Sequence, residues 1–293
     1  MKYGLFLGCT IPSRGRAYEL SARKVLDVLG VEYIDIQDFA CCGFPIKPAS
    51  VDASLLCALR NLVVAEQNGI SDLIVLCSGC TVQMTEAHHE FMHNEKFKLL
   101  GDEVLGKLGR KYNGAVKIKH FLRFLWEDIG TDKIKMSVKR PLEGLKVAPH
   151  YGCHYMKPTS VYGFDFVEDP RSLDDLVSAT GATVVHYRNY IHCCGGTIMG
   201  INAKSTYAIA RNKLDYVKAS SADCITLACP FCGTVYDDNQ KAIEEAFAVE
   251  YKIPVLFYSQ LLGLALGIPQ KDLGFALNKV KPKDMLQRVG ITE

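Results

Sequence analysis

Short apolar runs alternate along the chain with longer segments in which apolar residues recur every three or four positions. The short runs predict β-strands, and the longer segments predict amphipathic helices. In the first half we expect strands at residues 3–7, 31–36 and 72–76, helices at roughly 15–29, 51–68 and 82–112, and a short strand and helix near 116–127. Strands that alternate with helices in this way are typical of parallel α/β sheets.

The second half repeats this order. Strands are expected at residues 145–150, 182–187, 224–228 and 255–257, and a last helix follows the final strand. Between the halves, the polar, lysine-rich segment 127–144 contains Pro141 and is predicted to form a linker. We therefore expect an α/β protein with two duplicated parallel-sheet domains, residues 1–140 and 141–293, related by a pseudo-twofold axis.

Ten of the twelve cysteines form one five-cysteine pattern that occurs twice. Each copy has a leading cysteine, then a Cys-Cys pair, then a C-x2-C motif that begins after 34 intervening residues. The first set is Cys9, Cys41, Cys42, Cys77 and Cys80, and the second set is Cys153, Cys193, Cys194, Cys229 and Cys232. The interval after the leading cysteine is 31 residues in the first set and 39 in the second. Cys57 and Cys224 have no counterpart in the other half, so we expect them in the core.

Each cysteine motif follows a predicted strand. Because the carboxyl ends of parallel strands form the usual ligand crevice of an α/β sheet, each set is expected to converge on one point. The two C-x2-C motifs also precede predicted helices, whose N-terminal N–H groups favour the thiolate form. Gly43 and Gly195, which follow the Cys-Cys pairs, permit a tight turn and a close approach of the backbone to a ligand.

Composition and charge argue against several classes of protein function. The chain has 293 residues, 48% of them hydrophobic, which is enough for two cores. A net charge of +2 argues against a nucleic-acid binder, and no segment reaches the roughly 20 apolar residues of a membrane helix. The N-terminus lacks the pattern of a signal peptide, so we expect a cytoplasmic protein. Thiols stay reduced there and metal ligation is favoured over disulfides, although intracellular proteins of hyperthermophiles are an exception.

The ligand set favours iron over zinc. A structural zinc ion takes four ligands in a tetrahedron, whereas here five cysteines converge and two of them are adjacent in sequence. Neighbouring cysteines do not easily bind one small tetrahedral ion, but they can bind neighbouring irons of a cluster. Zinc in one half or in both is the alternative. The sequence has neither a GxGxxG fingerprint nor a Walker loop, so no nucleotide or flavin site is predicted.

The two Cys-Cys-Gly motifs, at residues 41–43 and 193–195, each have an upstream cysteine and a downstream C-x2-C. This arrangement resembles the two CCG (cysteine-rich) domains of the B-subunit family of methanogen heterodisulfide reductases, over nearly the whole chain. The resemblance implies two [4Fe-4S] clusters of the non-cubane type, one held by each five-cysteine set. It also implies an oxidoreductase of methanogenesis that reduces the CoM-S-S-CoB heterodisulfide to the thiols of coenzyme M and coenzyme B.

The resemblance implies partners as well. The ferredoxin-like C subunit of heterodisulfide reductase would deliver single electrons, with the flavin-containing A subunit behind it and a hydrogenase or formate dehydrogenase in a larger complex. Two alternatives stay open. One is an electron-transfer subunit of a quinone-linked succinate, glycolate or glycerol-3-phosphate oxidoreductase, and the other is a zinc-stabilised interaction module. About eight iron atoms per chain would separate the reductase from the zinc module.

Two facing clusters would supply the two electrons of S–S cleavage, so we assign catalysis to the clusters and to no separate side chain. His150, His154 and His192 are candidates to donate a proton to a leaving thiolate or a hydrogen bond to cluster sulfur, against a merely structural role for each. Both coenzymes carry acidic groups, so basic residues near the motif cysteines are candidate substrate contacts, against the interpretation as solvated loop charges. These residues are Arg14, Arg16, Lys47, Lys157 and Arg188.

Overall fold

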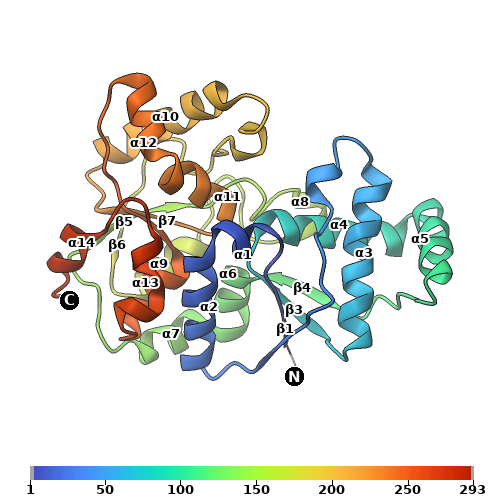
Figure 1. Ribbon diagram of the computed structural model, residues 1–293. Helices are drawn as coiled ribbons and strands as arrows, with labels where there is room; N and C mark the ends of the chain where they lie inside the picture. The colour runs from blue at the N-terminus through green and yellow to red at the C-terminus, as the bar shows by residue number, and fades with distance from the viewer. Residues whose placement is uncertain (1–2, 292–293) are drawn as a thin grey trace.

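Two parallel sheets of four strands each organise the protein (Figure 1), and the computed structural model describes residues 3–291. The first sheet has the order β2-β1-β3-β4 and the second has the order β6-β5-β7-β8. The strands of the first are β1 (Tyr3–Phe6), β2 (Tyr33–Asp35), β3 (Asp72–Val75) and β4 (Lys117–His120). Those of the second are β5 (Lys146–His150), β6 (Thr183–Val184), β7 (Cys224–Leu227) and β8 (Val255–Phe257). The predicted α/β class and the duplication are confirmed.

The strand register fixes which residues of the two halves are equivalent. In the first sheet Phe6 pairs with Val75, and in the second His150 pairs with Leu227. Phe6 and His150 therefore end equivalent strands, each three residues before the leading cysteine of its set. Beyond the Cys-Cys pairs, positions of the two halves correspond at a constant separation of 152 residues, as the two C-x2-C motifs show.

Helices connect the strands in the predicted order. In the first half they are α1 (Thr10–Arg14), α2 (Arg16–Val28), α3 (Val51–Gln67), α4 (Ser78–His93), α5 (Glu95–Lys107) and α6 (Phe121–Phe124). In the second half they are α8 (Thr159–Tyr162), α9 (Ser172–Ala179), α10 (Ala203–Ala219), α11 (Pro230–Gly233), α12 (Gln240–Phe247), α13 (Tyr258–Ala265) and α14 (Lys283–Arg288). The helical region expected at 82–112 is two helices, because the Asn94 side chain accepts a hydrogen bond from the Phe97 N–H and starts a new helix.

The segment predicted as a linker is largely helical. It includes most of a π-helical turn (Leu125–Ile129) and all of α7 (Thr131–Ser137). Ile134 of α7 is fully buried, and α7 packs against α9 of the second half. The prediction of a linker was wrong because the polar, lysine-rich composition hides one apolar side of a short helix. The domain boundary between residues 140 and 141 stays a prediction.

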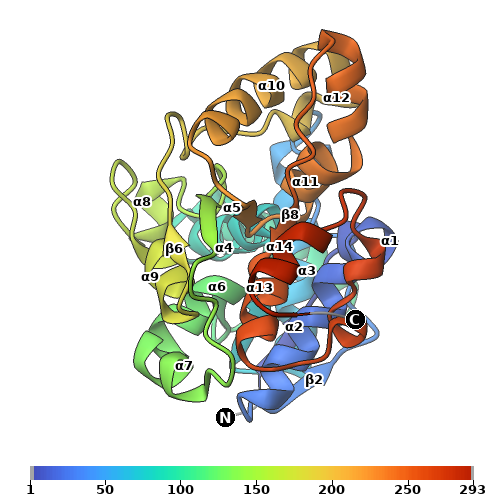
Figure 2. The same ribbon diagram turned by 90° about the vertical axis from the view of Figure 1, so that its left-hand side faces the viewer.

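In each half, the helix that follows the last strand packs against the other half. After β4, α6 packs against α9 of the second half, and after β8, α13 packs against α2 of the first half (Figures 1 and 2). At the second contact the Phe257 ring stacks on Tyr18 with centroids 4.4 Å apart, and the Ser21 and Ser259 hydroxyls lie 2.6 Å apart. At the start of α6, the His120 ring meets the Tyr155 ring of the second half edge-on at 5.1 Å. This reciprocal exchange makes the core continuous and sets the two sheets in a fixed relation.

Among residues 3–291, no helix combines the length and the apolar character needed to cross a membrane. The cytoplasmic location stays a prediction.

The reciprocal exchange generates a stability prediction. Replacing Phe257 with Ala removes the ring stacked on Tyr18 and leaves a cavity between the halves, so the free energy of unfolding should fall by about 3 kcal/mol or more. Urea unfolding followed by circular dichroism measures this change. Met136→Ala, at a side chain that is 81% exposed, is the control and should change the free energy by less than about 0.5 kcal/mol. Equal effects of the two substitutions would contradict a core that spans both halves.

Candidate metal centre and active site

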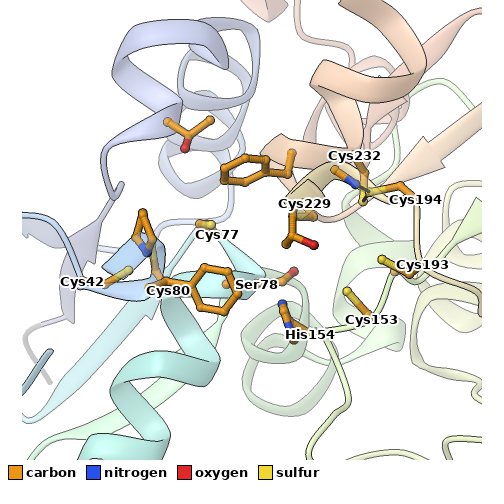
Figure 3. A pocket seen from close by; sticks show the side chains of 18 of the residues that line it. Cys42, Cys77, Ser78, Cys80, Cys153, His154, Cys193, Cys194, Cys229 and Cys232 are labelled. Atoms are coloured by element: carbon orange, nitrogen blue, oxygen red, sulfur yellow. Dashed lines mark hydrogen bonds between the residues drawn. The ribbon is translucent and has the colours of Figure 1, made fainter. Parts of the chain in front are cut away.

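One cavity lies between the two halves, and cysteines of both sets line it (Figure 3). It encloses about 610 Å³ of space not filled by atoms, part of it open to solvent. Its cysteines are Cys9, Cys42, Cys77, Cys80, Cys153, Cys193, Cys194, Cys229 and Cys232. The tenth, Cys41, is exposed, and its Sγ lies 4.0 Å from Cys9 Sγ at the edge of the first set. The structure thus brings both sets to one place between the sheets.

Strand ends and helix starts position these cysteines. Cys77 follows β3 and is the N-cap of α4, and Cys229 follows β7 and is the N-cap of α11. Cys9 follows β1 and is the N-cap of α1. The N–H groups and dipoles of these helix starts favour negative charge on sulfur. In the second set, backbone N–H groups of Gly195 and Gly196 also donate to the Cys193 and Cys194 sulfurs, both at 3.3 Å.

Glycines make room beside the sulfurs. Gly8 has a φ of +73°, and a Cβ atom there would lie 2.7 Å from Cys80 Sγ. Gly43 has a φ of +85°, and its Cβ would lie 2.4 Å from the Ser54 carbonyl oxygen. A side chain at either position would strain the backbone and displace its surroundings. Both glycines therefore shape the space in front of the first set.

The two sets approach each other at equivalent cysteines. Cys77 and Cys229, which correspond in the two halves, both line the cavity near its middle (Figure 3), and each shifts the pKa of the other. Within the second set, Cys232 Sγ lies 3.4 Å from Cys194 Sγ. The cavity is therefore shared, and its labelled first-set cysteines lie on one side and its second-set cysteines on the other (Figure 3).

Hydrogen bonds between the crowded cysteines lower the pKa of some thiols and raise the pKa of others. A hydrogen bond from Cys232, supported by one from Cys77, holds the pKa of Cys229 well below its ordinary value. Hydrogen bonds from Cys153 and then Cys194 lower the pKa of Cys193 strongly. The donors themselves have raised pKa values, as at Cys232, where the hydrogen bonds to Cys194 and Cys229 raise the pKa and burial raises it further. Few sulfurs can be thiolates together without added positive charge, which a metal centre supplies.

The residues present fit an iron–sulfur group. All twelve cysteines are free thiols in the structure, and the glycines leave space beside the sulfurs. The hydroxyls of Tyr18 and Tyr236 are buried and have no hydrogen-bond partner in the part of the chain that the structure describes. Burial raises the pKa of both, and nearby thiolates raise it further, Cys229 and Cys77 for Tyr18. Such donors are suited to the sulfide acceptors of a cluster.

A zinc-peptidase spacing, His89-Glu90-Phe-Met-His93, also occurs in α4. The two imidazole rings lie 4.7 Å apart. Within residues 3–291, however, no three or more His, Cys, Asp or Glu side chains are placed to hold a single ion. The pair therefore lacks the third ligand that a zinc site requires.

The three candidate histidines lie in different places. His154 lines the cavity, where its ring meets Phe44 edge-on at 5.0 Å, and burial lowers its pKa (Figure 3). His150 is fully buried under the second set, with Nε2 3.2 Å from Cys232 Sγ. The His192 side chain is exposed and is not part of the cavity lining. His150 and His154 are thus close to the sulfurs, whereas His192 faces solvent.

None of the five basic candidates is among the described residues that line the cavity. Lys47 forms an ion pair with Glu86. Arg14 and Arg16 border a separate cavity between the halves, which encloses about 1300 Å³ of space not filled by atoms, part of it open to solvent, and Lys157 and Arg188 are exposed. Their role in substrate contact stays a prediction. Of the two cysteines outside the sets, Cys224 is fully buried as expected, and Cys57 is half-buried in α3.

The sequence reasoning missed Lys213 and Ser78. Lys213 of α10 is only 2% exposed, and its Nζ contacts His150 Nδ1. Burial lowers its pKa to about 8, and thiolates, Cys232 first, oppose that shift. Its place among the apolar, inward-facing positions of α10 could have identified Lys213 from the sequence. A lysine at an inward position of an amphipathic helix needs a partner. Ser78 lines the cavity, and its hydroxyl lies 3.3 Å from His120 Nε2.

Comparisons with known proteins agree with this architecture. The sequence model of the cysteine-rich domain (CCG) family matches residues 3–85 and 147–236, which together hold both five-cysteine sets. A hypothetical protein from Helicobacter pylori has a similar solved structure, with a TM-score of 0.76 at 17% identity. The match covers 96% of this chain and 52% of that one, and it supports the fold alone.

Several curated relatives match over almost their full length. The B subunit of the ferredoxin/F(420)H(2)-dependent CoB-CoM heterodisulfide reductase of Methanosarcina acetivorans is 36% identical, over 98% of this chain and 97% of that protein. A protein of Archaeoglobus profundus named for its likeness to the heterodisulfide reductase B subunit is 34% identical, over 97% and 96%. The 8-methylmenaquinol:fumarate reductase membrane anchor subunit of Wolinella succinogenes is 31% identical, over 95% and 97%. With its duplicated fold and two complete cysteine sets, the chain belongs to the B-subunit family of heterodisulfide reductases.

Proposed function

We propose that the chain is a catalytic subunit that reduces the CoM-S-S-CoB heterodisulfide to the thiols of coenzyme M and coenzyme B. The observation that carries this proposal is the single cavity lined by both five-cysteine sets. A disulfide needs two electrons and two protons to become two thiols. A cavity with one redox centre on each side suits that stoichiometry, and relatives named as heterodisulfide reductase subunits support the substrate.

Each set would hold one [4Fe-4S] cluster of the non-cubane type. The first set offers Cys9, Cys41, Cys42, Cys77 and Cys80, and the second offers Cys153, Cys193, Cys194, Cys229 and Cys232. When bound, the two clusters would supply one electron each to the disulfide. The cleavage would take place in the cavity between the two sets.

The protein's own residues prepare this cavity. Phe44 and Phe231 lie on its wall and exclude water from the reacting sulfurs. The Gly195 and Gly196 N–H groups hold negative charge on the second set. His154 is the histidine of the lining, and it would donate a proton to a leaving thiolate.

Electrons would come from a ferredoxin-like C subunit, with a flavin-containing A subunit behind it and a hydrogenase or formate dehydrogenase in a larger complex. The names of two relatives include ferredoxin, which supports a ferredoxin-type source of electrons.

Loss of one cysteine from either set tests the two-centre proposal. Cys41→Ser and Cys193→Ser should each remove one cluster, lower the iron content from about eight to about four atoms per chain, and abolish heterodisulfide reduction. Iron and acid-labile sulfide analysis with EPR of anaerobically purified protein measures the first effect, and a thiol-release assay measures the second. Cys57→Ala, outside both sets, should keep both clusters. Full activity with both cluster signals in either serine variant, or colourless zinc-containing wild type, would contradict the proposal.

The role of His154 is tested against His192. His154→Ala should lower kcat/KM for the heterodisulfide by about 100-fold and leave the iron content unchanged, because the cavity loses its proton donor but no ligand. His192→Ala should have little effect on kcat/KM, since that side chain is exposed outside the cavity. Unchanged kcat/KM in His154→Ala, or a larger loss in His192→Ala, would exclude His154 as the donor.

A further inference from the structure

A buried lysine lies under the second set. Lys213 Nζ is 2.8 Å from the His192 carbonyl oxygen, 3.1 Å from the Tyr190 carbonyl oxygen and 3.0 Å from His150 Nδ1. The Tyr187 ring lies 5.7 Å away on another side. These contacts replace the water that the ammonium group loses on burial.

The contacts of Lys213 determine the direction of the next hydrogen bond. An ammonium group can only donate, so His150 Nδ1 must accept from Lys213. The proton of the neutral imidazole then resides on Nε2, which lies 3.2 Å from Cys232 Sγ. His150 therefore donates to the Cys232 sulfur. Lys213 thus places a positive charge beside His150, and His150 in turn donates a hydrogen bond to Cys232 of the second set.

The first half has neither a lysine nor a histidine at the two equivalent positions. Phe6 occupies the position of His150 at the end of the equivalent strand, and it packs against Phe39. Asn61 occupies the position of Lys213, where its Nδ2 donates to the Cys41 and Cys57 carbonyl oxygens without carrying charge.

A third position shows the same contrast. Met84 stands in the first half where Tyr236 stands in the second, four residues after the last cysteine of each set. The Tyr236 ring packs edge-on against His150 at 5.1 Å. The two sets contain equivalent cysteines. At the three positions compared, however, the second half has charged or polar side chains, whereas the first half has apolar or uncharged ones.

This difference has an electrochemical consequence. Reduction adds negative charge to an iron–sulfur centre, and nearby positive charge and hydrogen bonds to sulfur stabilise the reduced form. Building on the proposed function, we propose that Lys213 and His150 are positioning residues that give the second set the higher reduction potential. The first of the two electrons needed for disulfide cleavage is then held on the second half of the cavity, next to Cys232.

A redox titration tests this inference. The full chain is purified anaerobically, and EPR signals are followed against applied potential, with Cys41→Ser and Cys193→Ser assigning each signal to its half. In the wild type, the second-half signal should have the higher midpoint potential. In Lys213→Met, the ratio of reduced to oxidised centre in the second half should fall at least tenfold at a given potential, about 59 mV for a one-electron couple. The first-half midpoint and the iron content should not change.

Matched variants separate charge from packing. Asn61→Leu removes the equivalent hydrogen bonds in the first half without removing charge, and it should leave the second-half midpoint unchanged. His150→Phe, which installs the first-half residue, should lower the second-half midpoint in the same direction as Lys213→Met. Lys213→Arg keeps the charge and should retain most of the wild-type midpoint.

Several results would overturn the inference. Equal shifts of both midpoints in Lys213→Met, or no shift with iron retained, would do so. Loss of second-half iron in all three variants (Lys213→Met, His150→Phe and Lys213→Arg) would show that the pair is structural only. Absence of iron–sulfur signals from the wild type would instead overturn the proposed function, so the two failures are distinguishable.

Discussion

The mutual repulsion of buried thiolates governs this structure. Nine cysteines of the two sets line one cavity, and hydrogen bonds among them lower the pKa of some thiols, such as Cys193, and raise the pKa of others, such as Cys232. Full deprotonation without a cation would be costly in a partly buried space. The two sheets must therefore be held so that their strand ends face each other around a metal centre. The reciprocal packing of α6 on α9 and of α13 on α2 holds them in that relation.

Much of the fold was visible in the sequence, because its signals are local. Strand-length apolar runs, helical periodicity and the repeated cysteine spacing predicted the parallel sheets, the duplication and the strand-end position of the cysteines. The break at Asn94 and the helix α7 were not predicted, since one depends on a capping side chain and the other on a single buried face. The convergence of both sets on one cavity depends on how the halves pack, which no local pattern encodes.

Some site residues were also predictable from local sequence, whereas others depend on how the chain packs. The cysteines could be grouped from spacing alone, and nine of the ten line one cavity. The histidines could not be ranked, because proximity to a motif does not fix side-chain direction. His192 adjoins Cys193 in sequence and yet faces solvent, while His150 reaches Cys232 from a neighbouring strand. Lys213 is 19 residues after Cys194 and becomes relevant only because α10 turns it inward. Duplication kept the cysteines the same in both halves, while the residues beneath them differ in charge.

Anomalous diffraction at the iron edge, from anaerobically grown crystals, tests the central claim most directly. The claim is that both five-cysteine sets hold iron–sulfur clusters that face one cavity. It predicts two separate groups of iron peaks, one beside each set, on opposite sides of the cavity. Iron in only one half, or peaks that appear at the zinc edge instead, would contradict it.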